Sequence, residues 1–298
     1  KKYYLGIDLG STTSKAVIIN EKDEIIGRGI TNTRANYKVA ADIAREEATY
    51  DARFTLLTQR MQEEIDSKPE FKKYMQDIRS VFQYRQFKRR MDSLRKMLLK
   101  TVDDFKYDNK EDVKQALIKI LNVIEPQIRN EFVNEDLGSK NQFFRDIVSE
   151  RYNHEVEKAE KLVFEPLMLA FDKSITPVEN EMVQYNFKEL VDESMNVLEE
   201  KYKGLVDEPE HKDREDWYYA ELNAVKSNYK NVESTLREHI DEIADEDIHI
   251  ANMIGTGYGR ALLPFPEDCI KSEILCHAFG AHAVFPNTRT VLDIGGQD

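Results

Sequence analysis

The chain has 298 residues, of which 41% are hydrophobic and 33% charged, and its formal net charge is −13 at pH 7. This length suits two domains with packed cores. The acidity disfavours nucleic acid as a partner, and no apolar run approaches the length that spans a membrane.

The first predicted element is a β-hairpin at the N-terminus. Residues 3–8 and 15–20 are rich in aromatic and β-branched side chains, which is typical of strands. The residues between them are too few for a crossover helix, so the two strands should pair antiparallel. A third strand is expected over residues 24–30, which completes a β-meander.

The turn of this hairpin has the composition of a phosphate-binding loop. Gly10 lets the backbone approach a phosphate closely. The amides and hydroxyls of Ser11, Thr12 and Thr13 can donate hydrogen bonds to the phosphate, and Lys15 supplies a positive charge. An ordinary polar turn is the alternative interpretation, because small polar residues are common in turns.

A long helical segment is predicted next, over roughly residues 37–228. Apolar side chains recur at helical spacing within residues 71–82, 113–124 and 190–202. The segment Thr176-Pro-Val-Glu179 matches a capping box, so a helix is expected to begin there. We expect the apolar stripes to form the core of a helical bundle rather than a cofactor site.

One stretch of the predicted bundle is basic within an otherwise acidic chain. It comprises Arg85, Lys88, Arg89, Arg90, Arg95 and Lys96. Such a patch is suited to steering an acidic partner, so the bundle is expected to dock another subunit or an electron donor. A solvated helix face is the alternative interpretation.

The last part of the chain is predicted to alternate helix and strand. The expected elements are a helix over 232–244, a strand over 248–254, a helix over 272–285 and a strand over 290–294. The final strand runs into Asp293, Gly295 and Gly296. This order of strand, acid and glycine repeats the pattern seen at the N-terminus.

Two such hairpins facing each other would clamp the phosphates of a nucleoside triphosphate, with Mg²⁺ held between Asp8 and Asp293. Because Mg²⁺ dehydrates reluctantly, both carboxylates would act through water. Backbone amides near Gly295 and Gly296 would stabilise charge on the transferred phosphoryl group. The candidates for orienting the attacking water are Asp293, Gln297 and Asp298.

These motifs resemble the phosphate-1 and phosphate-2 motifs of the actin, Hsp70 and sugar-kinase superfamily. Three segments in order, residues 255–260, 272–281 and 293–298, narrow the resemblance to the BadF/BadG/BcrA/BcrD-type ATPases. The resemblance covers residues 3–33 and 234–298, and the middle of the chain does not match the small activators of that family.

The resemblance implies an α/β fold. A ribonuclease-H-like half-domain would comprise residues 1–33 and 232–298, and an all-helical domain would be inserted over residues 37–228. Members of this family drive low-potential electrons into 2-hydroxyacyl-CoA dehydratases or benzoyl-CoA reductases. The larger ATPase subunit of benzoyl-CoA reductase carries an insertion of about this size, so the resemblance implies that subunit.

The same resemblance implies the cofactors and partners. ATP and Mg²⁺ would bind, and a [4Fe–4S] cluster would be shared with a sister ATPase subunit through cysteines that follow Asp298. No iron–sulfur ligand is therefore expected within this chain, and Cys276 is interpreted as a packed core thiol. Further expected partners are reductase subunits that bind the acyl-CoA and a ferredoxin-like electron donor.

Three other functions remain open. They are an activator ATPase of a 2-hydroxyacyl-CoA dehydratase, a small-molecule kinase such as a sugar kinase, and a chaperone-like ATPase on the same fold. The chain opens on a strand rather than a signal peptide, and its two cysteines form no disulfide framework, so a cytoplasmic protein is expected.

Overall fold

The computed structural model describes the chain except residues 34–35, 136, 140–141, 184, 207–215 and 293–298. The chain is a mixed α/β protein with a four-stranded sheet and mostly helical content. The strands are β1 (Tyr3–Leu9), β2 (Thr13–Asn20), β3 (Ile25–Asn32) and β4 (Ile250–Thr256). The helices are α1 (Tyr37–Arg60), α2 (Gln62–Ser67), α3 (Pro69–Asp103), α4 (Lys110–Asn134), α5 (Phe144–Val156), α6 (Lys161–Glu179), α7 (Phe187–Val206), α8 (Asp216–Asp245) and α9 (Glu273–Val284).

Two compact units make up the chain. The first comprises residues 1–56 and 246–298 and contains the sheet, and the second comprises residues 57–245 and is helical. The first boundary falls within α1, and the second lies where α8 ends. The domain bounds expected from the sequence fall instead just before α1 and inside α8, and they stay a prediction.

The sheet has the order β3-β2-β1-β4. Strand β2 pairs antiparallel with β1 and β3, so the predicted hairpin and meander are confirmed. Strand β4 lies parallel to β1, which brings the carboxyl ends of both strands to one edge of the sheet. The turn between β1 and β2 lies at that same edge.

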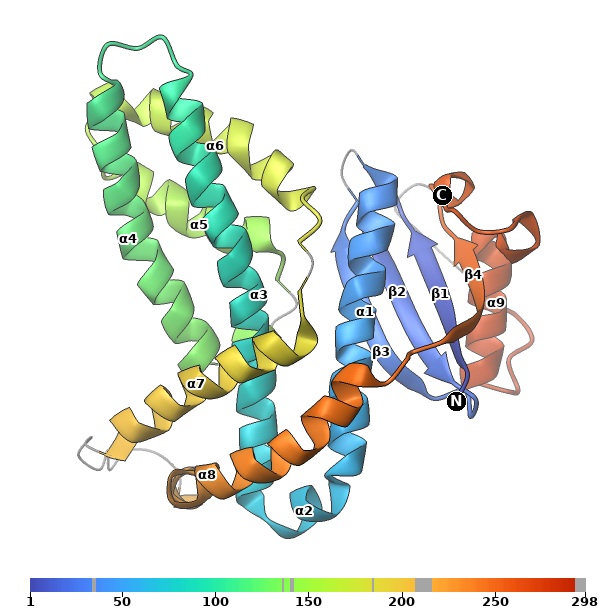
Figure 1. The fold of residues 1–298 in the computed structure, drawn as a ribbon. Coiled ribbons are helices and arrows are strands. Elements are labelled where there is room, and N and C mark those ends of the chain that lie inside the picture. The colour runs from blue at the N-terminus through green and yellow to red at the C-terminus, as the bar shows by residue number, and fades with distance from the viewer. Residues whose placement is uncertain (34–35, 136, 140–141, 184, 207–215, 293–298) are drawn as a thin grey trace. The chain divides into compact units, whose positions relative to one another are not determined.

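Helix α1 packs closely along one face of the sheet (Figure 1). Small residues allow this approach: Ala44, Ala48 and Ala52 of α1 are fully buried against Gly27 and Gly29 of β3. A Cβ atom added at Gly29 would lie 2.0 Å from the carbonyl oxygen of Ala44. The first twenty residues of α1 therefore belong to the core of the sheet unit.

The prediction of a strand over residues 290–294 is wrong for residues 290–292, which are the part that the structure describes. Thr290, Val291 and Leu292 lie outside the sheet, and Leu292 is 83% exposed. Apolar side chains suited to a strand are stable as one only when a neighbouring strand supplies hydrogen bonds and burial. Residues 293–298 lie outside the described part of the chain.

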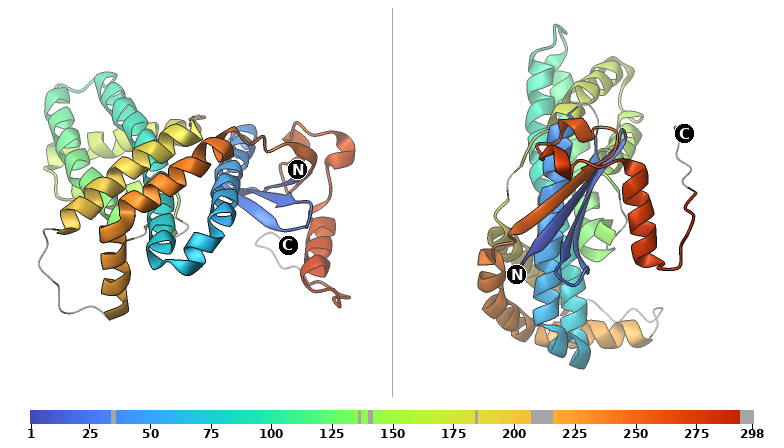
Figure 2. Two further views of the ribbon diagram at one scale, coloured as in Figure 1. Left: turned by 60° about the horizontal axis from the view of Figure 1, so that its bottom comes forward. Right: turned by 90° about the vertical axis from the view of Figure 1, so that its right-hand side faces the viewer.

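Helix α9 confirms the helix predicted over residues 272–285, and the Ser272 hydroxyl accepts a hydrogen bond from the Leu275 amide at its N-terminus. Figure 2 shows α9 on the side of the sheet opposite α1. None of its residues is buried against the described part of the chain. The interpretation of Cys276 as a packed core thiol is therefore wrong: it is only half-buried, because α9 gains no apolar cover.

The helical unit is organised around α3, which packs against α4, α6, α7 and α8. The three predicted apolar stripes are confirmed as its core. From α3, α4 and α7 the buried members are Phe71, Tyr74, Met75, Ile78, Val81, Phe82, Val113, Leu117, Ile120, Leu121, Ile124, Leu190, Val191, Leu198 and Tyr202, while Ala116 is partly buried. The helical spacing of these residues was a reliable signal because most of each stripe is buried.

The helix start predicted at Thr176 is wrong, because α6 already begins at Lys161 and ends at Glu179. Both polar residues of the presumed capping box bind Arg145 of α5 instead. Its guanidinium donates hydrogen bonds to the Thr176 hydroxyl at 2.6 Å and to the Glu179 carboxylate at 2.9 Å. Thr176 and Glu179 match the sequence pattern of a helix start, but in the structure their side chains connect α6 to α5.

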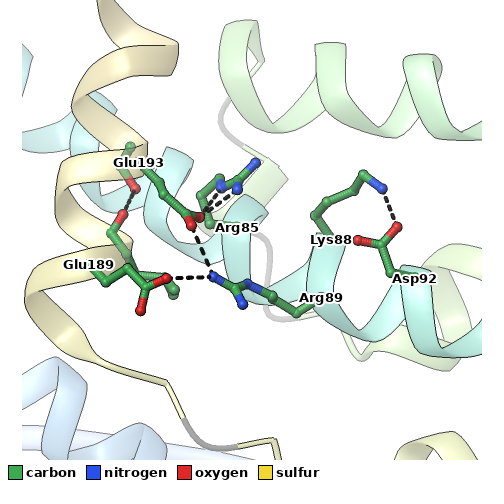
Figure 3. Close-up of polar contacts among 8 residues, drawn as sticks. Arg85, Lys88, Arg89, Asp92, Glu189 and Glu193 are labelled. Carbon is green, nitrogen blue, oxygen red and sulfur yellow. Dashed lines mark hydrogen bonds and ion pairs between the residues drawn. The ribbon is translucent and has the colours of Figure 1, made fainter.

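The basic stretch of α3 is largely neutralised within its own unit, which removes the main argument for a free basic docking patch (Figure 3). Arg85 and Arg89 both donate hydrogen bonds to Glu193 of α7, at 2.7 and 2.9 Å. Arg95 donates to Glu125 of α4 at 2.8 Å, and Lys88 pairs with Asp92. The pairs with Glu193 and Glu125 join α3 to α7 and α4, whereas the pair with Asp92 lies within α3.

A buried ionic cluster also holds α3 to α7. The Asp77 side chain is 10% exposed, and its Oδ2 accepts hydrogen bonds from the Tyr202 hydroxyl at 2.5 Å and pairs with Lys201 at 3.2 Å. Lys73, one turn earlier on α3, pairs with Asp77 as well. Burial raises the pKa of the adjacent Tyr74.

We expect Asp77→Ala to destabilise the helical unit by about 3 kcal/mol, because it leaves buried donors without their acceptor. Asp92→Ala is the matched control. Asp92 also lies on α3, four residues after a lysine, but its side chain is 46% exposed, so its loss should cost under about 0.5 kcal/mol. Urea unfolding followed by circular dichroism measures both, and equal effects would contradict the role of burial.

Candidate functional site

The hairpin turn lies where β1 ends, and residues 10–12 connect Leu9 of β1 to Thr13, the first residue of β2. A Cβ atom at Gly10 would lie 2.7 Å from the Thr13 carbonyl oxygen, so the turn closes too tightly for a side chain there. Ser11 and Thr12 are exposed at its tip. The structure thus presents the predicted loop residues to solvent on a constrained turn.

A threonine that the sequence analysis missed fixes the shape of this turn. Thr33, just after β3, is fully buried, and its hydroxyl donates to the Gly10 carbonyl at 2.7 Å. The Ser14 hydroxyl then donates to the Thr33 hydroxyl at 2.8 Å. In addition, the Thr33 amide donates to the Thr12 carbonyl at 2.9 Å. The end of β3 therefore holds both sides of the turn.

We expect Thr33→Val to destabilise the sheet unit by about 2 kcal/mol, because the Gly10 carbonyl and the Ser14 hydroxyl lose a buried partner. Thr49→Val is the control, since the Thr49 hydroxyl only donates to the Arg45 carbonyl on the surface of α1. Its effect should stay within about 0.5 kcal/mol. Thermal unfolding of the two variants would contradict the account if their melting temperatures fell equally.

The predicted metal residue, Asp8, lies at the carboxyl end of β1 beside Lys15. Lys15 is its direct partner on β2, and their side chains form an ion pair at 3.3 Å through Asp8 Oδ2. The other carboxylate oxygen, Oδ1, is buried and has no hydrogen-bond partner within the described residues. Leaving a buried carboxylate oxygen unpaired lowers the stability of the fold by about 1–3 kcal/mol or more. Asp8 Oδ1 can therefore accept a hydrogen bond or bind a cation.

The adjacent end of β4 contributes a second unpaired oxygen. Thr256 is the parallel partner of Asp8, is 8% exposed, and its hydroxyl also lacks a partner among the residues described. Gly257 follows with a φ angle of 93°, and a Cβ atom there would lie 2.5 Å from Asp8 Oδ1. The Gly259 amide donates to the Leu9 carbonyl at 2.8 Å, so this loop closes against the end of β1.

These residues fit a hydrated Mg²⁺. Carboxylate and hydroxyl oxygens can bind Mg²⁺ directly or accept hydrogen bonds from its water molecules. Without such a partner, both oxygens remain unsatisfied. Mg²⁺ would be held by Asp8. The remaining predicted site residues lie outside the described part of the chain: Asp293, Gly295, Gly296, Gln297 and Asp298.

The described residues do not fit an iron–sulfur cluster. No group of three or more His, Cys, Asp or Glu side chains within them could hold a metal ion. Desolvation, followed by the neighbouring Asp268 carboxylate, raises the pKa of the buried Cys269 thiol, and Cys276 lies apart on α9. A raised pKa disfavours the thiolate that a cluster requires.

A model of the BadF/BadG/BcrA/BcrD ATPase family matches residues 5–298. The chain belongs to this family. The family assignment made from the motifs is thus confirmed. Closeness to the benzoyl-CoA reductase subunit within the family stays a proposal.

Three relatives of the chain are named as dehydratase activators. The chain is 38% identical over 77 residues to the (R)-2-hydroxyglutaryl-CoA dehydratase activating ATPase of Acidaminococcus fermentans, covering 26% of this chain and 30% of the relative. It is 46% identical over 56 residues, 19% and 20% of the two chains, to the 2-hydroxyisocaproyl-CoA dehydratase activator of Clostridioides difficile. It is 34% identical over 87 residues, 29% and 33%, to the activator of lactoyl-CoA dehydratase of Anaerotignum propionicum.

The aligned regions span about a third or less of each of these relatives. No solved structure matches the chain. Within the described residues, no helix has both the length and the apolar composition needed to cross a membrane.

Proposed function

We propose that the hairpin of β1 and β2 binds the phosphates of Mg²⁺·ATP and that the protein hydrolyses ATP there. The observation that carries this proposal is the buried, unpartnered Oδ1 of Asp8 at the base of the turn. Membership of an ATPase family supports ATP hydrolysis as the reaction. The backbone amides and side-chain hydroxyls of Ser11, Thr12 and Thr13 can donate hydrogen bonds to phosphate oxygens.

In this proposal Ser11, Thr12, Thr13 and Lys15 act on the phosphates. The Ser11–Thr13 amides donate to phosphate oxygens and stabilise charge that develops during transfer. Lys15 exchanges its partner from Asp8 to a phosphate. This exchange requires little free energy, because the Lys15 side chain is 54% exposed and exposed ion pairs contribute little to stability. Mg²⁺ would neutralise phosphate charge when bound.

The C-terminal motif would complete the site. We propose that Asp293 faces Asp8 across the bound Mg²⁺ and that Gly295 and Gly296 offer amides to the phosphates from the other side. Asp293, Gln297 and Asp298 are the candidates for orienting the attacking water. The parallel pairing of β1 with β4 supports a ribonuclease-H-like arrangement, in which this motif follows a further strand.

We propose that ATP hydrolysis here drives electron transfer into a partner enzyme of the 2-hydroxyacyl-CoA dehydratase class. The names of the three relatives support this reading over the benzoyl-CoA reductase subunit. The long helical segment between β3 and β4 favours the reductase subunit as the second candidate.

We also propose that residues 57–245 are an insertion into the ATPase fold. The Arg53 guanidinium donates to the Glu246 carbonyl at 3.1 Å, so the two points where the chain leaves and re-enters the sheet unit lie close together. A short linker in place of residues 57–245 should therefore leave ATP hydrolysis intact. A folded deletion without ATPase activity would contradict the insertion.

Two measurements on the intact protein test the proposed function: phosphate release from ATP, and ATP-dependent reduction of a partner enzyme. We expect phosphate release from ATP that stops in EDTA, and ATP-dependent reduction of a 2-hydroxyacyl-CoA dehydratase. Reduction of a benzoyl-CoA reductase instead would favour the second candidate. Transfer of the γ-phosphate to a sugar hydroxyl would identify a kinase and contradict the proposal, as would hydrolysis that does not depend on a divalent cation.

A further inference from the structure

Two buried oxygens without partners lie at neighbouring strand ends. Asp8 and Thr256 are directly paired residues of the parallel strands β1 and β4, so their side chains lie on the same face of the sheet. Asp8 Oδ1 and Thr256 Oγ1 both lack a hydrogen-bond partner in the part of the chain that is described. Buried polar atoms in native proteins are nearly always satisfied, so this pair indicates a missing ligand.

The backbone packs closely around Thr256 and the Asp8 carboxylate. Gly255 and Gly257 flank it, and a Cβ atom at Gly257 would lie 2.5 Å from Asp8 Oδ1. Gly257 has a φ angle of 93°, which other residues rarely adopt. A side chain at position 257 would therefore displace the Asp8 carboxylate, and Thr256 is left as the polar group of β4 next to it.

The hydrogen-bonding chemistry of Asp8 Oδ1 and Thr256 Oγ1 restricts the kind of ligand that can satisfy both. The Asp8 carboxylate only accepts hydrogen bonds, and the Thr256 hydroxyl can also accept them. A phosphate would be repelled by Asp8. A hydrated Mg²⁺ carries water molecules that donate outward, and Mg²⁺ normally retains several of them in proteins. One hydrated cation can thus satisfy both oxygens.

We infer that Thr256 is a positioning residue for the hydrated Mg²⁺ that Asp8 holds, accepting a hydrogen bond from its water shell. This inference rests on the proposed function and adds a residue from β4 to the nucleotide site. A purely structural threonine would have its hydroxyl paired within the fold, as Thr33 does with the Gly10 carbonyl at 2.7 Å.

Calorimetric titration of the intact protein with ADP tests the inference, once with Mg²⁺ and once with EDTA. We expect Thr256→Val to weaken Mg²⁺·ADP binding about 3- to 10-fold, the effect of one lost hydrogen bond. Binding of ADP in EDTA should not change. Thr256→Ser keeps the hydroxyl and should bind Mg²⁺·ADP within about twofold of the original protein.

Unliganded stability gives a second readout. Thr256→Val removes a hydroxyl without a partner and keeps the shape of the side chain, so the melting temperature should stay equal or rise. Thr33→Val makes the same chemical change at a paired hydroxyl and should lower it. If Thr256→Val does not fold, Thr256→Ala serves the same titration.

The outcomes separate the inference from the function. If the original protein binds ADP more tightly with Mg²⁺ and Thr256→Val loses that gain while Thr256→Ser keeps it, the inference is supported. If both variants keep the gain, the inference is overturned and the proposed function stands. If the original protein shows no gain from Mg²⁺, both are overturned.

Discussion

Asp8→Asn is expected to lower Mg²⁺-dependent ATP hydrolysis at least about 100-fold while leaving the fold intact. The substitution removes the negative charge that would face Mg²⁺, and groups that stabilise charge in phosphoryl transfer carry effects of this size. Stability should hardly change, because the partner of Asp8 in the described residues is the exposed Lys15. Phosphate release at saturating ATP, together with circular dichroism, measures both effects.

Asp23→Asn is the matched control for this prediction. Asp23 lies in the turn between β2 and β3, is exposed, and has a φ angle of 59°, a conformation that asparagine also tolerates. The same loss of charge in the same meander should leave hydrolysis unchanged. If Asp8→Asn hydrolyses ATP as fast as Asp23→Asn, the metal assignment is wrong.

Gly29→Ala should cause the largest loss of stability in the sheet unit. The added methyl group would lie 2.0 Å from the Ala44 carbonyl oxygen and 2.6 Å from the Ala48 nitrogen. Backbone atoms cannot rotate away, so α1 must move off the sheet, at a cost of about 3 kcal/mol or more. Thermal unfolding should show a lowered melting temperature and a smaller yield of folded protein.

Gly280→Ala is the control for this substitution. Gly280 lies in α9 of the same unit, and its Cβ position has no atom within 4 Å. In an exposed helix the change from glycine to alanine should stabilise by roughly 0.5–1 kcal/mol. A Gly29→Ala variant as stable as the original protein would show that α1 does not pack on β3 as described.

Local patterns predicted much of the fold. The apolar runs and small polar turns predicted β1, β2 and β3, because an antiparallel meander is built from neighbours in sequence. The stripes of α3, α4 and α7 were equally clear, since helical burial has a fixed period. The helix start at Thr176 failed because its capping signal and its contact with Arg145 use the same side chains.

Features that depend on distant partners could not be predicted. The basic stretch looked free in sequence, yet Arg85 finds Glu193 more than a hundred residues later. Thr33 holds the hairpin turn only because the fold brings its hydroxyl to the Gly10 carbonyl. Thr256 lies next to Asp8 only because β4 pairs with β1. The glycines that flank Thr256 were the one local sign that its surroundings are crowded by backbone.

The most direct test of the central claim is a crystal structure of the intact protein with Mg²⁺ and a non-hydrolysable ATP analogue. The account predicts that backbone amides of Ser11, Thr12 or Thr13 lie within hydrogen-bond distance of the phosphates, with Mg²⁺ and its waters between the phosphates and Asp8. A nucleotide bound elsewhere, with the hairpin turn empty and Asp8 still paired only with Lys15, would contradict it.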